Sequence, residues 1–184
     1  MIADKSALLV IDVQNQFVEG LPEEMKGLSV VESVKHVIEA FRKAGRPIIY
    51  FREVHRKNLV DFGRELDGDE DVHAVEETRA ADYFTGIEPL PEEYQIVKRR
   101  YSGFFGTDLE ILLKGLGIEH IYAVGLLTDV CVHYTCADAH QHDYHIHVVR
   151  EAVGGSSLVA HEAALAAIEY LQHGAVISEK EVCE

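Results

Sequence analysis

The sequence is short of cysteine, of positive charge and of long apolar runs, and each shortage excludes a class of protein. Its three cysteines, Cys131, Cys136 and Cys183, include no Cys-x-x-Cys pair, which excludes a disulfide framework and a structural zinc site made of cysteines. The longest apolar stretches have the length of a strand, whereas a helix across a bilayer needs roughly 20 residues. The 17 Lys and Arg face 32 Asp and Glu, and the formal net charge of −15 argues against binding to phosphates. We therefore expect neither a membrane nor a nucleic acid as a partner.

What is present fits a globular protein of one domain. The chain has 184 residues, of which 47% are apolar, enough to bury a full core. Residues 1–6 lead directly into a strand pattern and lack the layout of a signal peptide. We therefore expect one domain over residues 1–184 and a cytoplasmic location. Acidic residues are concentrated between Glu65 and Asp82; such a run is typical of a solvated loop or helix face, and no metal site is predicted there.

Short apolar runs alternate with longer segments of helical periodicity. Strands are expected at residues 7–12, 47–51, 95–97, 120–124, 145–149 and 175–178, and helices at residues 30–44, 107–117, 129–142 and 158–173. Thr107 and Glu110 have the spacing of a capping box. The alternation predicts right-handed βαβ crossovers and an α/β fold, a three-layer α-β-α arrangement with a mainly parallel, doubly wound, Rossmann-like sheet. Residues 54–93 fit neither pattern, and loops of that length usually cover or bind ligands.

Three reactive side chains follow predicted strands. Asp12 ends the first strand, Lys98 ends the third, and Cys131 follows the fourth after a short turn. Ligands of open parallel sheets bind at the carboxyl ends of the strands, so these side chains are expected at one edge. A helix N-terminus at Cys131 would favour the thiolate, the reactive form. A buried cysteine is often inert, but a thiol beside a carboxylate and an ammonium supplies a nucleophile, a base and a cation.

Three segments carry a resemblance to a known superfamily. Asp12–Phe17 reads DVQNQF, Lys98–Leu109 reads KRRYSGFFGTDL, and Gly125–Val132 reads GLLTDVCV. They resemble the signature segments of the isochorismatase-like cysteine hydrolases, which include nicotinamidases, carbamoylsarcosine amidases and ureide hydrolases. The resemblance extends from about Ala7 to Ile177 and implies the isochorismatase-like fold.

The resemblance also implies roles for residues of this chain. Cys131 is expected to be the nucleophile, Asp12 the general base and acid, and Lys98 the cation in contact with both. The superfamily has a non-proline cis peptide before its threonine, which falls here at Leu126–Leu127. The N–H groups of Leu127 and Cys131 would then form the oxyanion hole, whose donors typically contribute about 2.7–4 kcal/mol to the transition state.

Two aromatic residues and one carboxylate have alternative interpretations. Phe17 and Tyr101 match positions where the superfamily surrounds a planar substrate with aromatic rings, but plain core packing is equally compatible with their sequence positions. Asp129 stands at the predicted start of a helix, where capping is the expected role.

A metal site is a further alternative. Nicotinamidases hold a metal through an Asp-x-His pair and a later histidine; the corresponding residues here are Glu53, His55 and His73. A carboxylate with two imidazoles suits zinc, iron or manganese. Glu replaces the shorter Asp, however, and with 11 histidines chance matches are easy. We therefore predict no required cofactor, with a divalent metal at these three residues as the alternative.

The predicted function is cysteine-dependent hydrolysis of a C–N bond other than a peptide bond. True isochorismatases cleave a vinyl ether and generally lack this cysteine, so Cys131 favours a small amide, carbamoyl or ureido substrate and a thioester intermediate. Relatives commonly assemble, so a homo-oligomer, dimer or tetramer, is expected. The alternatives are a metal-containing nicotinamidase and a non-catalytic binding protein on the same fold.

Overall fold

Six parallel strands form one sheet in the computed structural model, which describes residues 2–184 apart from the side chains of residues 27 and 28. Met1, the first residue of the predicted domain 1–184, lies outside the described residues. The strands are β1 (Ser6–Ile11), β2 (Ile48–Glu53), β3 (Tyr94–Lys98), β4 (His120–Leu126), β5 (His145–Gly154) and β6 (Val176–Ile177). Their order is β3-β2-β1-β4-β5-β6, and every pair is parallel.

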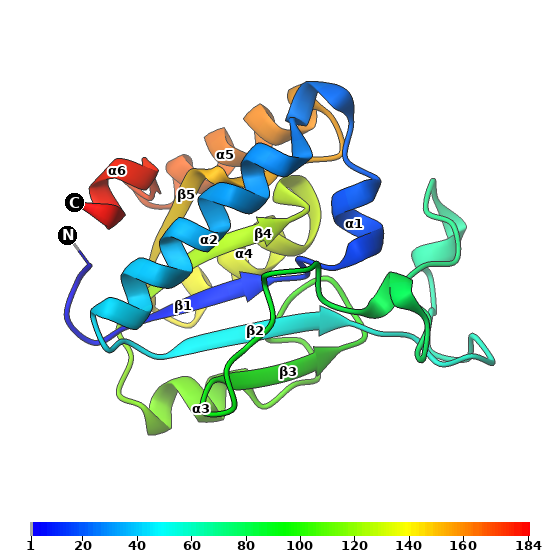
Figure 1. The fold of residues 1–184 in the computed structure, drawn as a ribbon, viewed down its shortest axis with the longest axis horizontal. Helices are drawn as coiled ribbons and strands as arrows, with labels where there is room; N and C mark the ends of the chain where they lie inside the picture. Colours follow the sequence, from blue (N-terminus) through cyan, green and yellow to red (C-terminus); the bar gives the residue numbers. More distant parts are fainter. Residues whose placement is uncertain (1) are drawn as a thin grey trace.

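Helices cover both faces of this sheet (Figure 1). They are α1 (Asn15–Glu19), α2 (Gly27–Lys43), α3 (Leu109–Gly115), α4 (His133–Gln141), α5 (Leu158–Leu171) and α6 (Glu179–Cys183). One apolar core packs the sheet against α1, α2 and α6, and the other packs it against α3, α4 and α5. The predicted three-layer fold with a parallel sheet is confirmed. No helix among the described residues is long and apolar enough to cross a membrane.

The burial of β1 explains why its sequence is apolar from Ala7 to Ile11. All six residues are buried. Ala7, Leu9 and Ile11 belong to one core, and Leu8 and Val10 belong to the other. A parallel strand covered on both faces needs apolar side chains on both sides, so its sequence shows a continuous apolar run instead of alternation.

Two local predictions around the helices were only partly right. α3 begins at Leu109, and the Thr107 hydroxyl accepts the N–H of that residue, as a cap does, and donates to the carbonyl of Gly103, so only half of the predicted capping box is present. Glu110 instead pairs with Lys114 one turn later. The helix predicted at 129–142 consists of a wide π-type turn at Thr128–Val132, η4, followed by α4.

The strand order places a crevice between β1 and β4. The chain leaves β1 toward β2 on one side and later enters β4 on the other, and in such sheets ligands bind at the carboxyl ends where the order reverses. Gly125 permits the close approach of these strands, since its φ is +118° and a Cβ there would lie 2.0 Å from the carbonyl oxygen of Ile11. The first part of the segment 54–93 extends beyond the carboxyl end of β2, and its last part returns along the sheet to the amino end of β3 (Figure 1).

A histidine stack at the amino ends of β4 and β5 should make stability dependent on pH. His147 stacks on Tyr122 with ring centroids 4.4 Å apart, and its Nε2 lies 3.1 Å from His120 Nδ1. Burial, with His120 and His145 adding to it, lowers the pKa of His147 to about 4. The unfolded chain, with a His pKa of about 6.5, binds more protons between these values, so stability should fall as pH drops from about 6.5 toward 4.

Urea denaturation across that pH range tests this expectation. His147→Phe keeps the ring stack without the titration and should flatten the slope. An equally steep slope in the variant would assign the acid sensitivity to other groups.

Candidate active site

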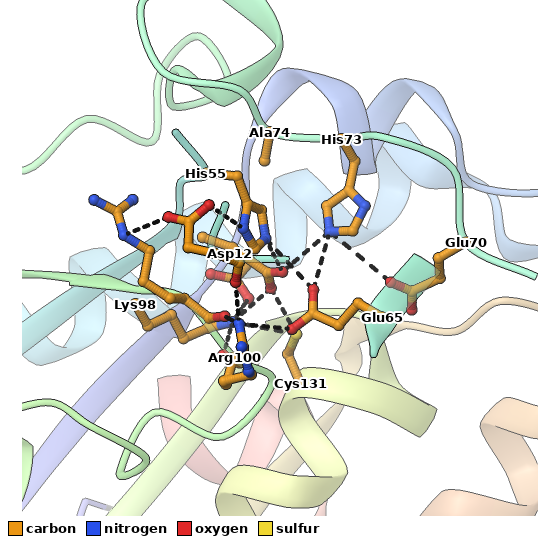
Figure 2. A network of polar contacts seen from close by, with 12 residues as sticks. Asp12, His55, Glu65, Glu70, His73, Ala74, Lys98, Arg100 and Cys131 are labelled. Atoms are coloured by element: carbon orange, nitrogen blue, oxygen red, sulfur yellow. Dashed lines mark hydrogen bonds and ion pairs between the residues drawn. The ribbon is translucent and has the colours of Figure 1, made fainter. Parts of the chain in front are cut away.

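Lys98, the last residue of β3, is the centre of a buried polar network (Figure 2). Its side chain is 0% exposed. Its Nζ lies 2.7 Å from Asp12 Oδ2, and it donates to Glu53 Oε2 at 2.8 Å, to the carbonyl of Arg100 at 2.9 Å and to Cys131 Sγ at 3.3 Å. Burial alone would lower the pKa of Lys98, but Asp12, Cys131 and Glu53 outweigh it and hold that pKa well above the usual value. The structure thus brings together the three residues that the sequence placed at strand ends.

Asp12 has free acceptor capacity next to the sulfur. It follows β1 with a φ of +49°, a left-handed conformation uncommon for residues other than glycine. Apart from the Lys98 ion pair, neither of its buried carboxylate oxygens has a hydrogen-bond partner among the described residues. Burial raises the pKa of Asp12 to about 6, with Lys98 opposing and Glu53 assisting the rise. A carboxylate with such a pKa can both accept and return a proton near neutral pH.

Cys131 lies in η4, directly after β4, and is 6% exposed. Its thiol, with the carboxylates of Asp12 and Glu53, forms a group whose polar atoms lie within 4.8 Å of one another. Burial raises the pKa of Cys131 well above its usual value; Lys98 opposes this rise, and the two carboxylates reinforce it. The Lys98 ammonium, 3.3 Å from the sulfur, is the contact that favours the thiolate, and the effect expected from the helix N-terminus stays a prediction.

A cavity of about 200 Å³ opens above the sulfur. It is lined by the residues Gln16, Phe17, Glu53, Glu70, Asp71, His73, Tyr101, Leu126, Leu127, Val130 and Cys131. Phe17 and Tyr101, the two predicted aromatic residues, are both in its wall. The Leu126–Leu127 peptide is cis, as predicted. At about 30 Å³ per water molecule, this space suits a small, flat ligand.

Glu53 connects the thiol to a cluster of histidines. Its Oε2 accepts from Lys98 and lies 3.5 Å from Cys131 Sγ. Its Oε1 lies 3.1 Å from the Nε2 atoms of both His55 and His73. Burial would raise the pKa of Glu53, but Lys98 and both imidazoles hold it well below the usual value. The Glu53 carboxylate thus contacts both the Lys98–Cys131 pair and the two histidines. Its position in the sequence did not indicate this.

Glu65 completes the histidine cluster, and no pattern in the sequence indicated this role. Its Oε2 lies 3.4 Å from His55 Nε2 and 3.7 Å from His73 Nε2, yet both of its buried oxygens lack a hydrogen-bond partner among the described residues. The interpretation of the whole acidic run as a solvated face was therefore wrong for Glu65, which a 3₁₀ turn, η2 (Glu65–Asp67), directs inward. Figure 2 shows Glu65 beside His73.

The cluster has the dimensions of a metal site. Glu53, His55, Glu65 and His73 are all buried, and their donor atoms lie within 4.8 Å of one another. Donors about 2.0–2.2 Å from a tetrahedral zinc ion would be about 3.3–3.6 Å apart, close to the 3.1–3.7 Å found here. His73 Nδ1 lies 2.7 Å from the carbonyl oxygen of Asp71, which places a proton on Nδ1 and leaves Nε2 free as a ligand. These residues fit a divalent metal.

Hydrogen bonds to α5 and to the residues just before it hold the turn that contains Cys131. Asp129 does not cap a helix: its Oδ1 accepts the N–H of Ser156 at 2.8 Å, and its Oδ2 accepts the Ser156 hydroxyl at 2.5 Å. The buried hydroxyl of Thr128 lies 2.9 Å from Nδ1 of His161. These partners are about 30 residues away in the sequence, so no local pattern could have identified them.

The chain belongs to the isochorismatase family. The model of the isochorismatase domain matches residues 6–182. The predicted resemblance is therefore confirmed over nearly the whole chain.

Similar proteins include hydrolases of carbon–nitrogen bonds. The chain is 34% identical over 166 residues, 86% of its length, to a protein of Arabidopsis thaliana named a probable inactive nicotinamidase, of which it covers 85%. It is 30% identical over 170 residues to the ureidoacrylate amidohydrolase RutB of Caulobacter segnis, covering 80% of this chain and 71% of that one. The crystal structure of a Pyrococcus horikoshii pyrazinamidase in complex with zinc has a TM-score of 0.81 and 32% identity, covering 95% of this chain and 99% of that one. The predicted enzyme class, hydrolysis of C–N bonds other than peptide bonds, is confirmed at the level of the family.

Proposed function

We propose that this protein hydrolyses the C–N bond of a small amide, carbamoyl or ureido compound, with Cys131 as the nucleophile. The observation that carries the proposal is the Lys98 ammonium, 2.7 Å from Asp12 and 3.3 Å from Cys131, below a cavity that reaches the sulfur. It joins a proton acceptor, a cation and a nucleophile where a small ligand fits.

The first half of the reaction forms a thioester. As the sulfur of Cys131 attacks the carbonyl carbon, Asp12 takes the thiol proton, and Lys98 stabilises the negative charge on both groups. The N–H groups of Leu127 and Cys131 donate to the oxygen of the tetrahedral intermediate. Its collapse breaks the C–N bond, and the leaving ammonia or amine takes the proton from Asp12.

The second half restores the thiol. Water attacks the thioester carbonyl carbon while Asp12 accepts a proton from it. The C–S bond then breaks, the acid leaves, and the sulfur recovers the proton from Asp12. Phe17 and Tyr101 line the cavity where they can enclose a flat substrate.

Ammonia release across a panel of primary amides, ureides and biuret tests this function. Turnover of at least one compound, together with stoichiometric labelling of Cys131 by iodoacetamide faster than labelling of the exposed Cys183, is expected. A Cys131 that reacts no faster than Cys183, with no turnover, would instead favour the non-catalytic binding protein. The name of the Arabidopsis relative makes that outcome worth testing.

A metal-containing amidase of the nicotinamidase type is the second candidate, and the cluster of Glu53, His55, Glu65 and His73 favours it. A bound divalent ion would supply Lewis acidity at the cavity wall to which Glu53 and His73 contribute. The zinc-bound pyrazinamidase neighbour supports the same assignment.

Metal analysis of the purified protein should find one zinc, iron or manganese ion per chain. Glu65→Gln removes a ligand and is expected to weaken metal affinity at least about 100-fold, since even partners of ligands contribute 10–100-fold. Asp67→Asn, on the same turn but exposed and paired with Arg64, is the matched control and should bind metal normally.

Protein supplied with all three metals that still holds none would contradict the assignment. The cluster would then be held by protonated imidazoles. In the protein without metal, burial lowers the pKa of His55, but Glu53 and Glu65 outweigh it and raise this pKa to about 9.

A further inference from the structure

Carboxylates dominate the charged part of the cavity wall. Glu53, Glu70 and Asp71 line the cavity, and none of its described lining residues is lysine or arginine. His73 is the lining residue that can carry a positive charge, and its Nε2 lies 3.1 Å from Glu53 Oε1. An anionic ligand would therefore find no free cation in this wall.

The nearest cations are occupied by other groups. Lys98 lies below Cys131, where Asp12, Glu53 and the carbonyl of Arg100 surround its ammonium. The Arg100 guanidinium lies 3.6 Å from Glu65 Oε1 and donates to two backbone carbonyls, so it faces away from the cavity. A divalent metal held by Glu53 and Glu65 would form a group of zero net charge with those two carboxylates.

Glu70 and Asp71 stand at the outer part of the same wall. Glu70 is half-buried, and its Oε2 lies 3.9 Å from His73 Nε2 (Figure 2). Asp71 is exposed, and its backbone carbonyl holds the His73 ring. Neither carboxylate has an arginine or lysine partner among the described residues, so His73, near Glu70, is the cationic group that can offset their charge.

We propose that Glu70 and Asp71 make this site selective for uncharged or positively charged amides and against substrates that carry a carboxylate. The inference rests on the proposed hydrolase function and narrows its substrate class. A carboxylate on the substrate would lose its hydration without gaining a charge-assisted partner, and it would lie near like charges. By this criterion ureidoacrylate, whose name includes a carboxylate, is disfavoured.

Two alkylating reagents of equal size and different charge test the selectivity. Iodoacetamide is neutral and iodoacetate is anionic, and both form a C–S bond at Cys131 and release iodide. Peptide mass spectrometry measures the two rates at Cys131. Their ratio is compared with the ratio of the same two rates for 2-mercaptoethanol, a free thiol without a protein site. We expect the preference for iodoacetamide to be about tenfold greater at Cys131, and to shrink in 0.5 M salt because salt screens partly exposed charges.

The double variant Glu70→Gln with Asp71→Asn should lower the ratio at least threefold toward that of 2-mercaptoethanol. Because both reagents attack the same thiol, their ratio cancels any change in the reactivity of that thiol, and circular dichroism establishes that the variant is folded. Asp69→Asn, an exposed carboxylate on the same loop that does not line the cavity, should leave the ratio unchanged. An unaltered ratio in the double variant, or a wild-type ratio equal to that of 2-mercaptoethanol, would overturn the proposal.

Turnover supplies the second arm, with succinamide and succinamate as neutral and anionic substrates of equal size. Succinamide should be hydrolysed at least about tenfold faster, and equal rates would overturn the selectivity. If no amide were hydrolysed while Cys131 still discriminated between the reagents, the hydrolase function would fail and the charge selectivity would stand. If Cys131 reacted with neither reagent and no amide were hydrolysed, both proposals would fail together.

Discussion

Cys131→Ala is expected to lower turnover of any amide substrate by at least about 10⁴-fold while leaving the fold intact. The sulfur is a nucleophile that both lines the cavity and contacts the Lys98 ammonium, and enzymes that lose a covalent nucleophile lose rates of this order. The measurement is steady-state ammonia release, with circular dichroism and urea denaturation to establish that the variant is folded.

The other two cysteines provide matched controls. Cys136 is 1% exposed in the core on the same side of the sheet, five residues beyond Cys131, and Cys183 is exposed near the C-terminus. Cys136→Ala should lose some stability and Cys183→Ser very little, and both should keep turnover within a few-fold of the wild type. Substantial activity in Cys131→Ala would remove this residue from the mechanism.

Lys98→Met is expected to destroy activity and to destabilise the fold together. The side chain is fully buried against Asp12 and Glu53, so its removal leaves two carboxylates without their common counter-charge. Breaking a buried ion pair by removing one partner costs about 3–5 kcal/mol, which corresponds to roughly 6–20 °C in Tm for a domain of this size. Urea and thermal denaturation measure the loss.

Two further variants identify its cause. Lys114→Met removes an exposed ammonium that pairs with Glu110, and a surface pair of this kind contributes at most about 1 kcal/mol. Adding Asp12→Asn to Lys98→Met removes one uncompensated carboxylate and should recover part of the stability but none of the turnover. If Lys98→Met were as stable as the wild type, the buried ion pairs of Lys98 would contribute less to the stability of the fold than their burial indicates.

The histidine cluster shows where local sequence patterns stop being informative. Glu53 ends β2 and His55 follows two residues later, so their spacing could be matched to a ligand pattern. Glu65 has exposed charged neighbours, and nothing in its own segment distinguishes it from them. Its burial depends on the path of residues 54–93 over the sheet, where His55 pairs with Val75 and stacks on Phe62. Such a path is set by distant contacts and not by periodicity.

The capping predictions were only partly right for a related reason. Thr107 and Asp129 both have side chains that cap helices well, and both stand near a helix start. In the folded chain Thr107 accepts the N–H of Leu109 but also donates to the carbonyl of Gly103, and Asp129 instead accepts from the backbone and hydroxyl of Ser156. A side chain that can satisfy several partners takes the one that packing brings to it.

The sequence by itself determined the parallel α/β fold, the family, and the presence of Asp12, Lys98 and Cys131 at one edge of the sheet. It could do so because buried strands have continuous apolar runs and because parallel strands end at a common edge. Only the tertiary structure decided that Glu53 joins the thiol to the histidines, that Glu65 turns inward, and that Glu70 and Asp71 line the cavity. Those relations depend on how a loop without periodicity lies across the sheet, and that is fixed by contacts between residues distant in the chain.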